Sequence, residues 1–256
     1  MHEADSQNPR QLAQLRWLLA LGLVLPSVVT WIYFDLLHDS APAIQQSAFT
    51  FGKIVQFLLP LIAWQLTRAA AEPAHRVIAP KARYEQSSAA GAVSGLLIGS
   101  AIIAVYFYFL LPGGWMDGPR LAAQDKLKSM GLNSKSMLLA AAVFYSLFHS
   151  GLEEYYWRWF IFGRLTRLVP LSWAIGISSL GFMAHHVIVL ARYFSWNSPL
   201  TIIFALGVAV GGVVWAELYR RTGSLLGPWI SHALVDASIF VIAFDLAFAD
   251  LPPGAY

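Results

Sequence analysis

Long apolar runs separated by short polar segments make up most of the 256-residue chain. A helix needs roughly 20 apolar residues to cross the ~30 Å hydrocarbon core of a bilayer, and the runs have about this length. The pattern predicts an all-α fold, a polytopic membrane bundle of seven to eight transmembrane helices in a single domain, 1–256. The seven candidate spans are Leu12–Leu37, Ala48–Leu66, Ala89–Leu111, Met137–Phe162, Leu171–Phe194, Leu200–Tyr219 and Leu225–Phe248.

Composition supports an integral membrane protein. Charged residues make up 12% of the chain and hydrophobic residues 57%, whereas a soluble domain carries about 25% charged residues. The net charge of +3 lies in short basic clusters between apolar runs, which favours lipid headgroups over nucleic acid as the partner. The chain contains no cysteine, which excludes disulfides, thiolate metal sites and a cysteine nucleophile.

Basic residues near the ends of the spans predict a cytoplasmic N-terminus, by the positive-inside rule. The four clusters that would then lie inside are Arg10 and Arg16; Arg68, Arg76, Lys81 and Arg83; Arg164 and Arg167; and Arg220 and Arg221. The basic loop 112–136 would lie outside, so we expect it to hold an interfacial segment or an eighth span. We expect the first apolar run to be a retained helix, because no small-residue cleavage pattern follows it clearly.

Three charged residues interrupt the fourth span. Glu153, Glu154 and Arg158 lie within six positions of apolar sequence. Each central charge costs roughly 2.5–3.5 kcal/mol on insertion, whereas each Leu, Ile, Phe or Val contributes only about 0.3–0.6 kcal/mol in return. These side chains must therefore face a protein interior or a wet cavity, and such residues indicate a functional site.

The spacing of these charges suggests different roles for the two acids. Glu154 and Arg158 stand at i and i+4, in the favourable order for a helical ion pair. Glu153 is left with His149, one turn earlier, as its local partner. Glu153 is therefore the candidate general base, able to take a proton from water. The alternative is an ion pair that only locks helix packing.

Histidines occupy two further spans. His185 and His186 are adjacent, and neighbours on a helix point about 100° apart, so we expect only one of them to face the site. A satisfied core histidine is the structural alternative. His232 and Asp236 stand at i and i+4, and Asp236 is expected to fix the tautomer of His232 and leave its other ring nitrogen facing a cavity. The alternative for this pair is a buried polar clip.

The depths of these residues agree. At ~1.5 Å per residue, Glu153 lies about 21 Å, His186 about 24 Å and His232 about 14 Å from the predicted cytoplasmic ends of their spans. The polar residues of three helices thus fall in one broad layer of the membrane interior. The sequence predicts one site built from all three helices.

Familiar hydrolase motifs are missing from the sequence. It contains neither HExxH nor GxSxG, which argues against a zincin-type metal helix and a serine hydrolase. Glutamate, histidine and aspartate can activate water directly or hold a metal through nitrogen and oxygen ligands. We expect no required cofactor. The alternative is a divalent metal such as zinc, with Glu153, His186 and His232 as its ligands.

Together the three motifs resemble the CAAX prenyl protease and bacteriocin-processing (CPBP, Abi) family of intramembrane proteases. The family pattern is EExxxR, FxxxH and HxxxN or HxxxD on separate membrane helices. The corresponding segments here are Glu153–Arg158, Phe182–His186 and His232–Asp236. The stretch Tyr219–His232 also resembles the family's approach to its last motif. The resemblance places a four-helix catalytic core at 137–248 and leaves 1–136 as N-terminal helices without a recognised motif.

The resemblance implies an intramembrane endopeptidase, expected in a bacterial cytoplasmic membrane, that cuts membrane-associated peptides or proteins. Glu153 would be the base, Glu154 and Arg158 would organise the site, and His186 would position water. His232 and Asp236 would stabilise the oxyanion, although an ionised Asp236 in place of the usual asparagine cannot itself donate.

Two features leave alternatives open. The spacing from Phe182 selects His186, whereas the family's Ala-His step selects His185. The substrate, and whether it is prenylated, cannot be read from the sequence. The alternative functions are a non-proteolytic binding or bacteriocin-immunity protein and, ranked lower, an ion or metal carrier with a midplane site.

Overall fold

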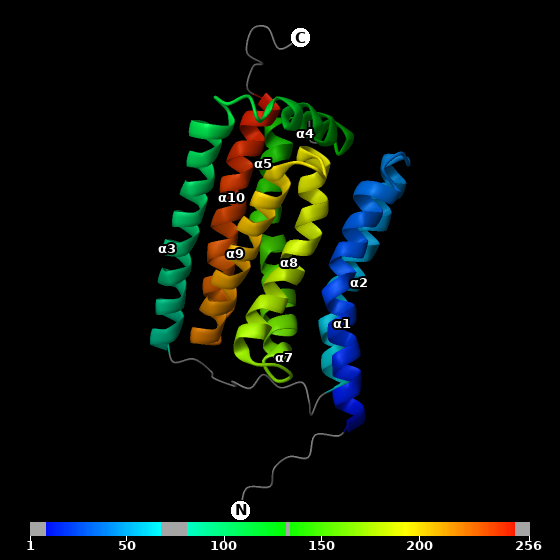
Figure 1. Cartoon of the computed structure of the whole chain (residues 1–256), viewed down its shortest axis with the longest axis vertical. Coiled ribbons are helices and arrows are strands. Elements are labelled where there is room, and N and C mark those ends of the chain that lie inside the picture. The colour runs from blue at the N-terminus through cyan, green and yellow to red at the C-terminus, as the bar shows by residue number, and fades with distance from the viewer. Residues whose placement is uncertain (1–8, 68–80, 132–133, 249–256) are drawn as a thin grey trace, which may run out of the picture.

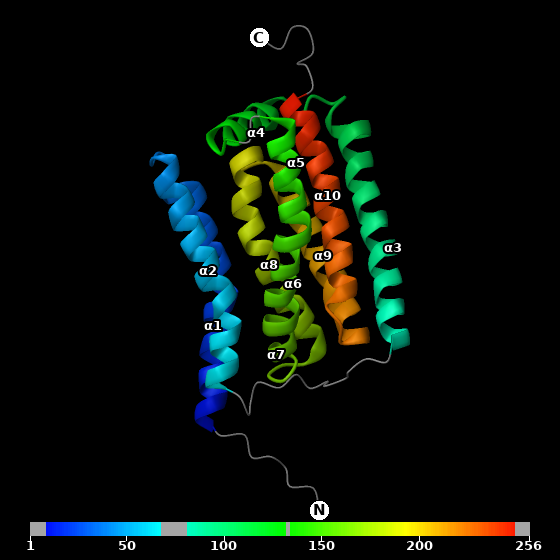
Figure 2. The ribbon, with the colours of Figure 1, turned by 180° about the vertical axis from the view of Figure 1, so that it is seen from behind.

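The computed structural model describes residues 9–67, 81–131 and 134–248, and within these ranges the regular structure is entirely helical. The predicted all-α class is confirmed (Figures 1 and 2). The helices are α1 Pro9–Trp31, α2 Pro42–Leu66, α3 Lys81–Val105, α4 Asp117–Ser129, α5 Lys135–Val143, α6 Ser150–Glu154, α7 Gly163–Leu165, α8 Leu171–Phe194, α9 Pro199–Thr222 and α10 Leu226–Phe248. Four π-helical stretches join or extend them, namely η1 Ile32–Leu36, η2 Tyr106–Leu110, η3 Phe144–His149 and η4 Tyr155–Phe162.

Six helices in the described part of the chain are long and apolar enough to cross a membrane. They correspond to six of the seven predicted spans, and the bounds of Leu171–Phe194 agree at both ends. The remaining prediction, the fourth span Met137–Phe162, is not among the six. Its residues form a continuous helical stretch from α5 to α7 that contains the charged motif and two π-helical stretches, features typical of functional sites rather than of lipid-facing helices.

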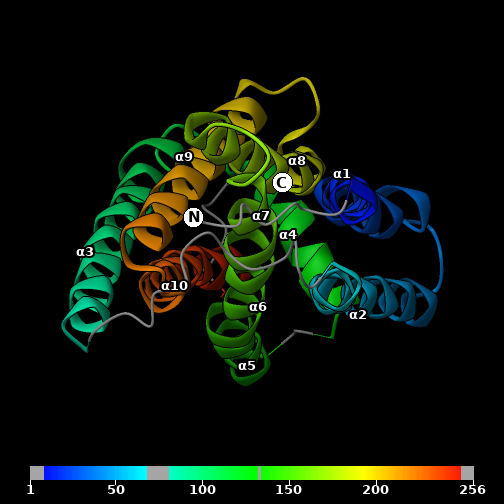
Figure 3. The same cartoon turned by 90° about the horizontal axis from the view of Figure 1, so that it is seen from below.

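This stretch from α5 to α7 lies between α9 and α10 on one side and the hairpin of α1 and α2 on the other, and α8 packs against both α9 and α1 (Figure 3). Its second half carries several of the largest fully buried aromatic side chains, including Tyr156, Trp157 and Phe160. Leu15 and Leu19 of α1 and Phe182 of α8 belong to the same hydrophobic cluster. The charged motif is therefore surrounded by protein.

Helix α3 covers the outer face of α10 (Figure 1). Glycines let the two backbones approach closely: a Cβ on Gly95 would stand 2.8 Å from the carbonyl oxygen of Ser231, and a Cβ on Gly91 would collide with Gly227. Small residues are the usual means of bringing membrane helices together, because close packing replaces the hydrophobic driving force there. This seam fixes the position of α10 and of the histidine it carries.

The basic loop 112–136 contains α4, a 13-residue helix that lies across the end of the bundle (Figure 1). This agrees with the expected interfacial segment, since α4 is too short to be an eighth span. Arg120 of α4 is buried and forms an ion pair with Asp245 of α10 at 3.2 Å. Of the basic residues used for orientation, Arg68 and Arg76 lie outside the described residues.

Candidate active site

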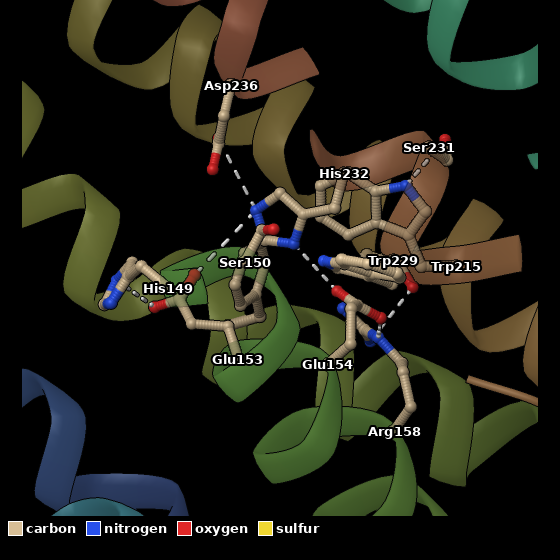
Figure 4. A network of polar contacts seen from close by, with 12 residues as sticks. His149, Ser150, Glu153, Glu154, Arg158, Trp215, Trp229, Ser231, His232 and Asp236 are labelled. Carbon is tan, nitrogen blue, oxygen red and sulfur yellow. Dashed lines mark hydrogen bonds and ion pairs between the residues drawn. The ribbon is translucent and has the colours of Figure 1, made fainter. Parts of the chain in front are cut away.

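The predicted site residues gather where α6 and η4 meet α8 and α10 (Figure 4). Glu154 and Arg158 have no exposed surface, and Glu153, His185 and His232 are buried. Figure 4 shows His149, Glu153, Glu154, Arg158, His232 and Asp236 joined in one network of polar contacts. The prediction that these residues converge from separate helices agrees with this geometry.

The ion pair expected between Glu154 and Arg158 is present. Arg158 Nε donates to Glu154 Oε2 at 3.0 Å, and a second guanidinium nitrogen, Nη1, donates to the carbonyl oxygen of Gly212 in α9 at 3.2 Å. The guanidinium also lies over the ring of Phe182, 5.4 Å from its centroid. Glu154 and Arg158 thus tie η4 to α8 and α9.

Glu154 also holds His232, which the sequence did not indicate. Nδ1 of His232 lies 2.9 Å from Glu154 Oε1, whereas Asp236 Oδ1 lies 3.6 Å from Nε2 of the same ring. The expectation that Asp236 fixes the tautomer is therefore wrong. A carboxylate only accepts, so Nδ1 carries a hydrogen and Nε2 is the nitrogen that faces Asp236 and Glu153.

The two oxygens of Glu153 have different surroundings. Oε1 faces three nitrogen atoms from three helical segments: His149 Nε2 at 3.3 Å, His185 Nε2 at 3.6 Å and Lys53 Nζ at 4.0 Å. Oε2 faces His232 Nε2 at 3.8 Å. One oxygen is therefore anchored, and the other points toward the imidazole of α10.

Sequence reasoning missed Lys53. It is a single lysine inside the apolar span Ala48–Leu66, and its cost there, roughly 2.5–3.5 kcal/mol, is the signal that drew attention to Glu153. The same energetic argument applied to every span would have found it.

Both histidines of α8 lie at the site, contrary to the expectation that only one would. Their ring centroids are 4.1 Å apart, and one ligand atom from each lies within 4.8 Å of the other and of a Glu153 oxygen. His186 turns back along its helix, with Nδ1 2.9 Å from the carbonyl oxygen of Phe182. His185 contacts Glu153 directly. Both side chains therefore reach the site, although they leave the helix axis about 100° apart.

These positions change the set of residues that can hold a metal. Glu153, His185 and His186 form a potential ligand group, whereas the set expected from the sequence contained His232 in place of His185. Two imidazoles and one carboxylate match the composition of a catalytic zinc site. Lys53 Nζ, however, lies 4.0 Å from the same carboxylate, and an ammonium at that distance repels a divalent cation bound there. The residues therefore fit a metal poorly.

The ring of His232 is held by Trp215 of α9. The two rings stack with centroids 4.0 Å apart and planes 15° apart. Trp215 Nε1 in turn donates to Ser231 Oγ at 3.0 Å (Figure 4). Ser94 of α3 donates to the same hydroxyl. The orientation of His232 is thus fixed on its face by Trp215 and at its edge by Glu154.

The aromatic residues beside the motif pack against neighbouring helices. Tyr156 and Trp157 are fully buried, and the hydroxyl of Tyr156 donates to the carbonyl oxygen of Gly22 in α1 at 2.6 Å. Trp157 stacks on His185. Trp229 donates to the carbonyl oxygen of Leu147 at 2.8 Å. These rings fix the helices that present the polar groups.

Fold and site together define a helical integral membrane protein with a buried carboxylate and imidazole centre. Residues 135–238, from α5 into α10, match the family model described as type II CAAX prenyl endopeptidase Rce1-like. The resemblance to the CAAX protease family is therefore confirmed for this part of the chain. The match supports a CAAX-protease-like membrane peptidase at the level of the family. No curated protein and no solved structure matches the chain significantly.

Proposed function

We propose that the protein is an intramembrane endopeptidase in which Glu153 activates a water molecule for attack on a peptide bond. The observation that carries the proposal is the unequal use of the Glu153 oxygens: Oε1 is anchored by nitrogen atoms, and Oε2 lies 3.8 Å from His232 Nε2. A water in hydrogen-bond contact with Oε2 would be next to a general base and an imidazole donor.

The reaction then proceeds by proton transfers that this set of residues can provide. Oε2 takes a proton from water as the water oxygen bonds to the carbonyl carbon. His232 Nε2, protonated, donates to the oxyanion, and such a donor contributes about 2.7–4 kcal/mol to an acyl-transfer transition state. Asp236 Oδ1, 3.6 Å from that nitrogen, favours the protonated ring. Glu153 finally passes its proton to the leaving nitrogen as the C–N bond breaks.

The histidines of α8 support Glu153 and the water. His185 contacts the anchored oxygen, which supports a role in orienting the carboxylate. His186, the residue that the family spacing selects, is the candidate for positioning water through Nε2, because its Nδ1 lies against the carbonyl oxygen of Phe182. Lys53 beside Glu153 supports direct activation of water over activation by a metal.

Cleavage by the purified protein in liposomes tests the proposal. Peptides with one membrane-spanning or lipid-anchored segment are incubated with the protein, including matched C-terminal CAAX peptides with and without a farnesyl group. Mass spectrometry then identifies the products. We expect the wild type to cut at least one peptide. The Glu153→Gln and His232→Ala variants should cut none, although their melting curves show that they are folded. Equal cleavage by Glu153→Gln would overturn the proposal.

The same variant separates the peptidase from a non-proteolytic immunity protein. Cells that carry wild type or Glu153→Gln are challenged with a bacteriocin. Protection that is the same in both, together with no cleaved peptide, would favour the binding function, because that function needs the fold but not the base.

We also propose that α1 begins on the cytoplasmic side of a bacterial inner membrane. Arg10 and Arg16 of α1, Arg164 of α7, and Arg220 and Arg221 of α9 belong to helix ends that lie together at the lower end of Figure 1. This grouping supports the orientation by the positive-inside rule. Labelling of single cysteines introduced at these ends tests it, because the chain has no other cysteine.

A further inference from the structure

Lys53 lies near the middle of α2, in the part of the chain that carries no recognised motif. At ~1.5 Å per residue it stands about 17 Å from one end of the helix and about 20 Å from the other. Its side chain is too short to bring the ammonium to a membrane interface from there. A central lysine of this kind needs a partner inside the protein.

The surroundings of the ammonium point it at Glu153. Nζ lies 4.0 Å from Glu153 Oε1, and only 14% of the lysine side chain is exposed. The rings of Phe49 and Phe57, one turn before and one turn after, lie 5.5 and 5.6 Å from Nζ by their centroids. Two aromatic faces attract the cation and restrict its position.

We propose that Lys53 is a positioning residue that fixes the Glu153 carboxylate through Oε1 and leaves Oε2 for the attacking water. The inference rests on the proposed function and deepens it. It also extends the active site beyond residues 135–238, which match the family model, to the hairpin of α1 and α2. In this arrangement the hairpin is part of the catalytic unit.

The chemistry of the three groups around Oε1 supports this role. His149 and His185 lie at 3.3 and 3.6 Å, and a neutral imidazole can donate one hydrogen bond but does not balance the carboxylate charge. The ammonium of Lys53, 4.0 Å from Oε1, supplies the positive charge that balances it. Because these groups face Oε1 rather than Oε2, losing the ammonium would leave Oε1 with two imidazoles and no counter-charge, and would loosen the last torsion of the carboxylate, which has only a broad intrinsic preference.

Kinetics on the full-length protein test the role. Lys53→Met keeps the length of the side chain and removes its charge. We expect kcat to fall about 10- to 100-fold, as when an orienting partner is lost, and KM to stay within about twofold. Lys128→Met, at an exposed site in α4, is the matched control and should leave both constants unchanged. Wild-type kcat in a folded Lys53→Met variant would overturn the proposal.

Chemical rescue distinguishes charge from packing. Because the chain contains no cysteine, Lys53→Cys introduces a single thiol. Alkylation with 2-bromoethylamine rebuilds a lysine-like side chain with its ammonium, and iodoacetamide adds a neutral group instead. We expect the first reagent to restore most of the lost kcat and the second to restore little. Equal rescue by both reagents would contradict a role for the charge.

A thermal double-mutant cycle tests the pairing without any peptide substrate. We expect Lys53→Met to lower the melting temperature of the wild type but not that of Glu153→Gln, because the lysine then has no carboxylate to balance. Additive shifts would overturn the inference. If no peptide is cut while the cycle is non-additive, the proposed function fails and the pairing of Lys53 with Glu153 stands.

Discussion

Glu154 Oε1 accepts a hydrogen bond from His232 Nδ1 at 2.9 Å, and this contact joins the first motif to the last. The other oxygen of Glu154 accepts from Arg158 at 3.0 Å. One buried carboxylate thus holds a guanidinium and an imidazole at once. The consequence for His232 is a fixed ring with Nε2 directed toward Glu153 and Asp236.

Replacing Glu154 should therefore weaken the fold as well as the site. Glu154→Gln leaves the buried guanidinium of Arg158 without its counter-charge, and breaking a buried pair costs about 3–5 kcal/mol. Unfolding in detergent, followed by circular dichroism, measures the loss. Glu217→Gln is the control, because Glu217 pairs with Arg220 and Arg221 at partly exposed positions, where a pair contributes about 1 kcal/mol or less. Equal losses in the two variants would contradict the structural role.

The stack of Trp215 on His232 makes a second prediction. Trp215→Ala should destabilise the protein by about 3–5 kcal/mol, the usual cost of removing a buried tryptophan, and should reduce kcat by freeing the imidazole. Trp215→Phe should lose less stability and less kcat than Trp215→Ala, because it keeps a ring against His232. It should still lose some of each, because it lacks the hydrogen bond to Ser231.

Kinetics and melting curves of the two variants, beside the exposed control Trp196→Ala, provide the test. Full activity in Trp215→Ala would show that His232 does not need this ring. A loss in Trp196→Ala as large as that in Trp215→Ala would show that the effect is not specific to the stack.

Metal chelation gives a third prediction. EDTA and 1,10-phenanthroline should leave peptide cleavage unchanged, because Lys53 supplies the positive charge beside Glu153. Added zinc should inhibit by binding Glu153, His185 and His186, and it should inhibit Lys53→Met at lower concentrations since the repelling ammonium is gone. A preparation that loses activity with chelator and regains it with zinc would contradict direct activation of water by Glu153.

Lys126 of α4, which lies outside the candidate membrane spans, should make the free energy of unfolding depend on pH. Burial, with the positive charge of Arg192 as the second cause, lowers the pKa of Lys126 from 10.5 to about 8. Between about pH 8 and 10.5 the unfolded chain therefore binds more protons at this group than the folded protein does, so its contribution to the free energy of unfolding rises with pH. Below about pH 8 the contribution is constant.

The measurement is the difference in melting temperature between wild type and Lys126→Met at pH 7.5 and at pH 9.5. We expect the difference to shift in favour of the wild type at the higher pH. The subtraction removes the other groups that titrate in this range. A difference that stays constant or moves toward Lys126→Met would contradict the lowered pKa.

Six spans and the ion pair between Glu154 and Arg158 could be predicted because both depend on local sequence. The apolar run Leu171–Phe194 begins after Pro170 and is long enough to span, and its observed bounds agree. Glu154 and Arg158 pair along one helix, so their i, i+4 spacing was sufficient.

Contacts between distant helices could not be predicted. Glu154 with His232, Trp215 with His232 and Lys53 with Glu153 depend on how each helix is rotated about its axis, which side-chain packing of the whole bundle decides. The close α3–α10 seam at Gly95 is one such determinant. The fourth predicted span, Met137–Phe162, is expected as a regular membrane helix, because the pattern of apolar residues does not reveal π-helical turns.

Single-turnover cleavage of one identified peptide by Glu153→Gln and Glu153→Asp decides whether Glu153 is the base. A general base contributes about 10²- to 10⁴-fold to the rate. We expect Glu153→Gln, shown by its melting curve to be folded at the assay temperature, to slow cleavage by at least about 100-fold and Glu153→Asp to retain part of the rate. Cleavage by folded Glu153→Gln within about twofold of the wild-type rate would show that another group activates the water.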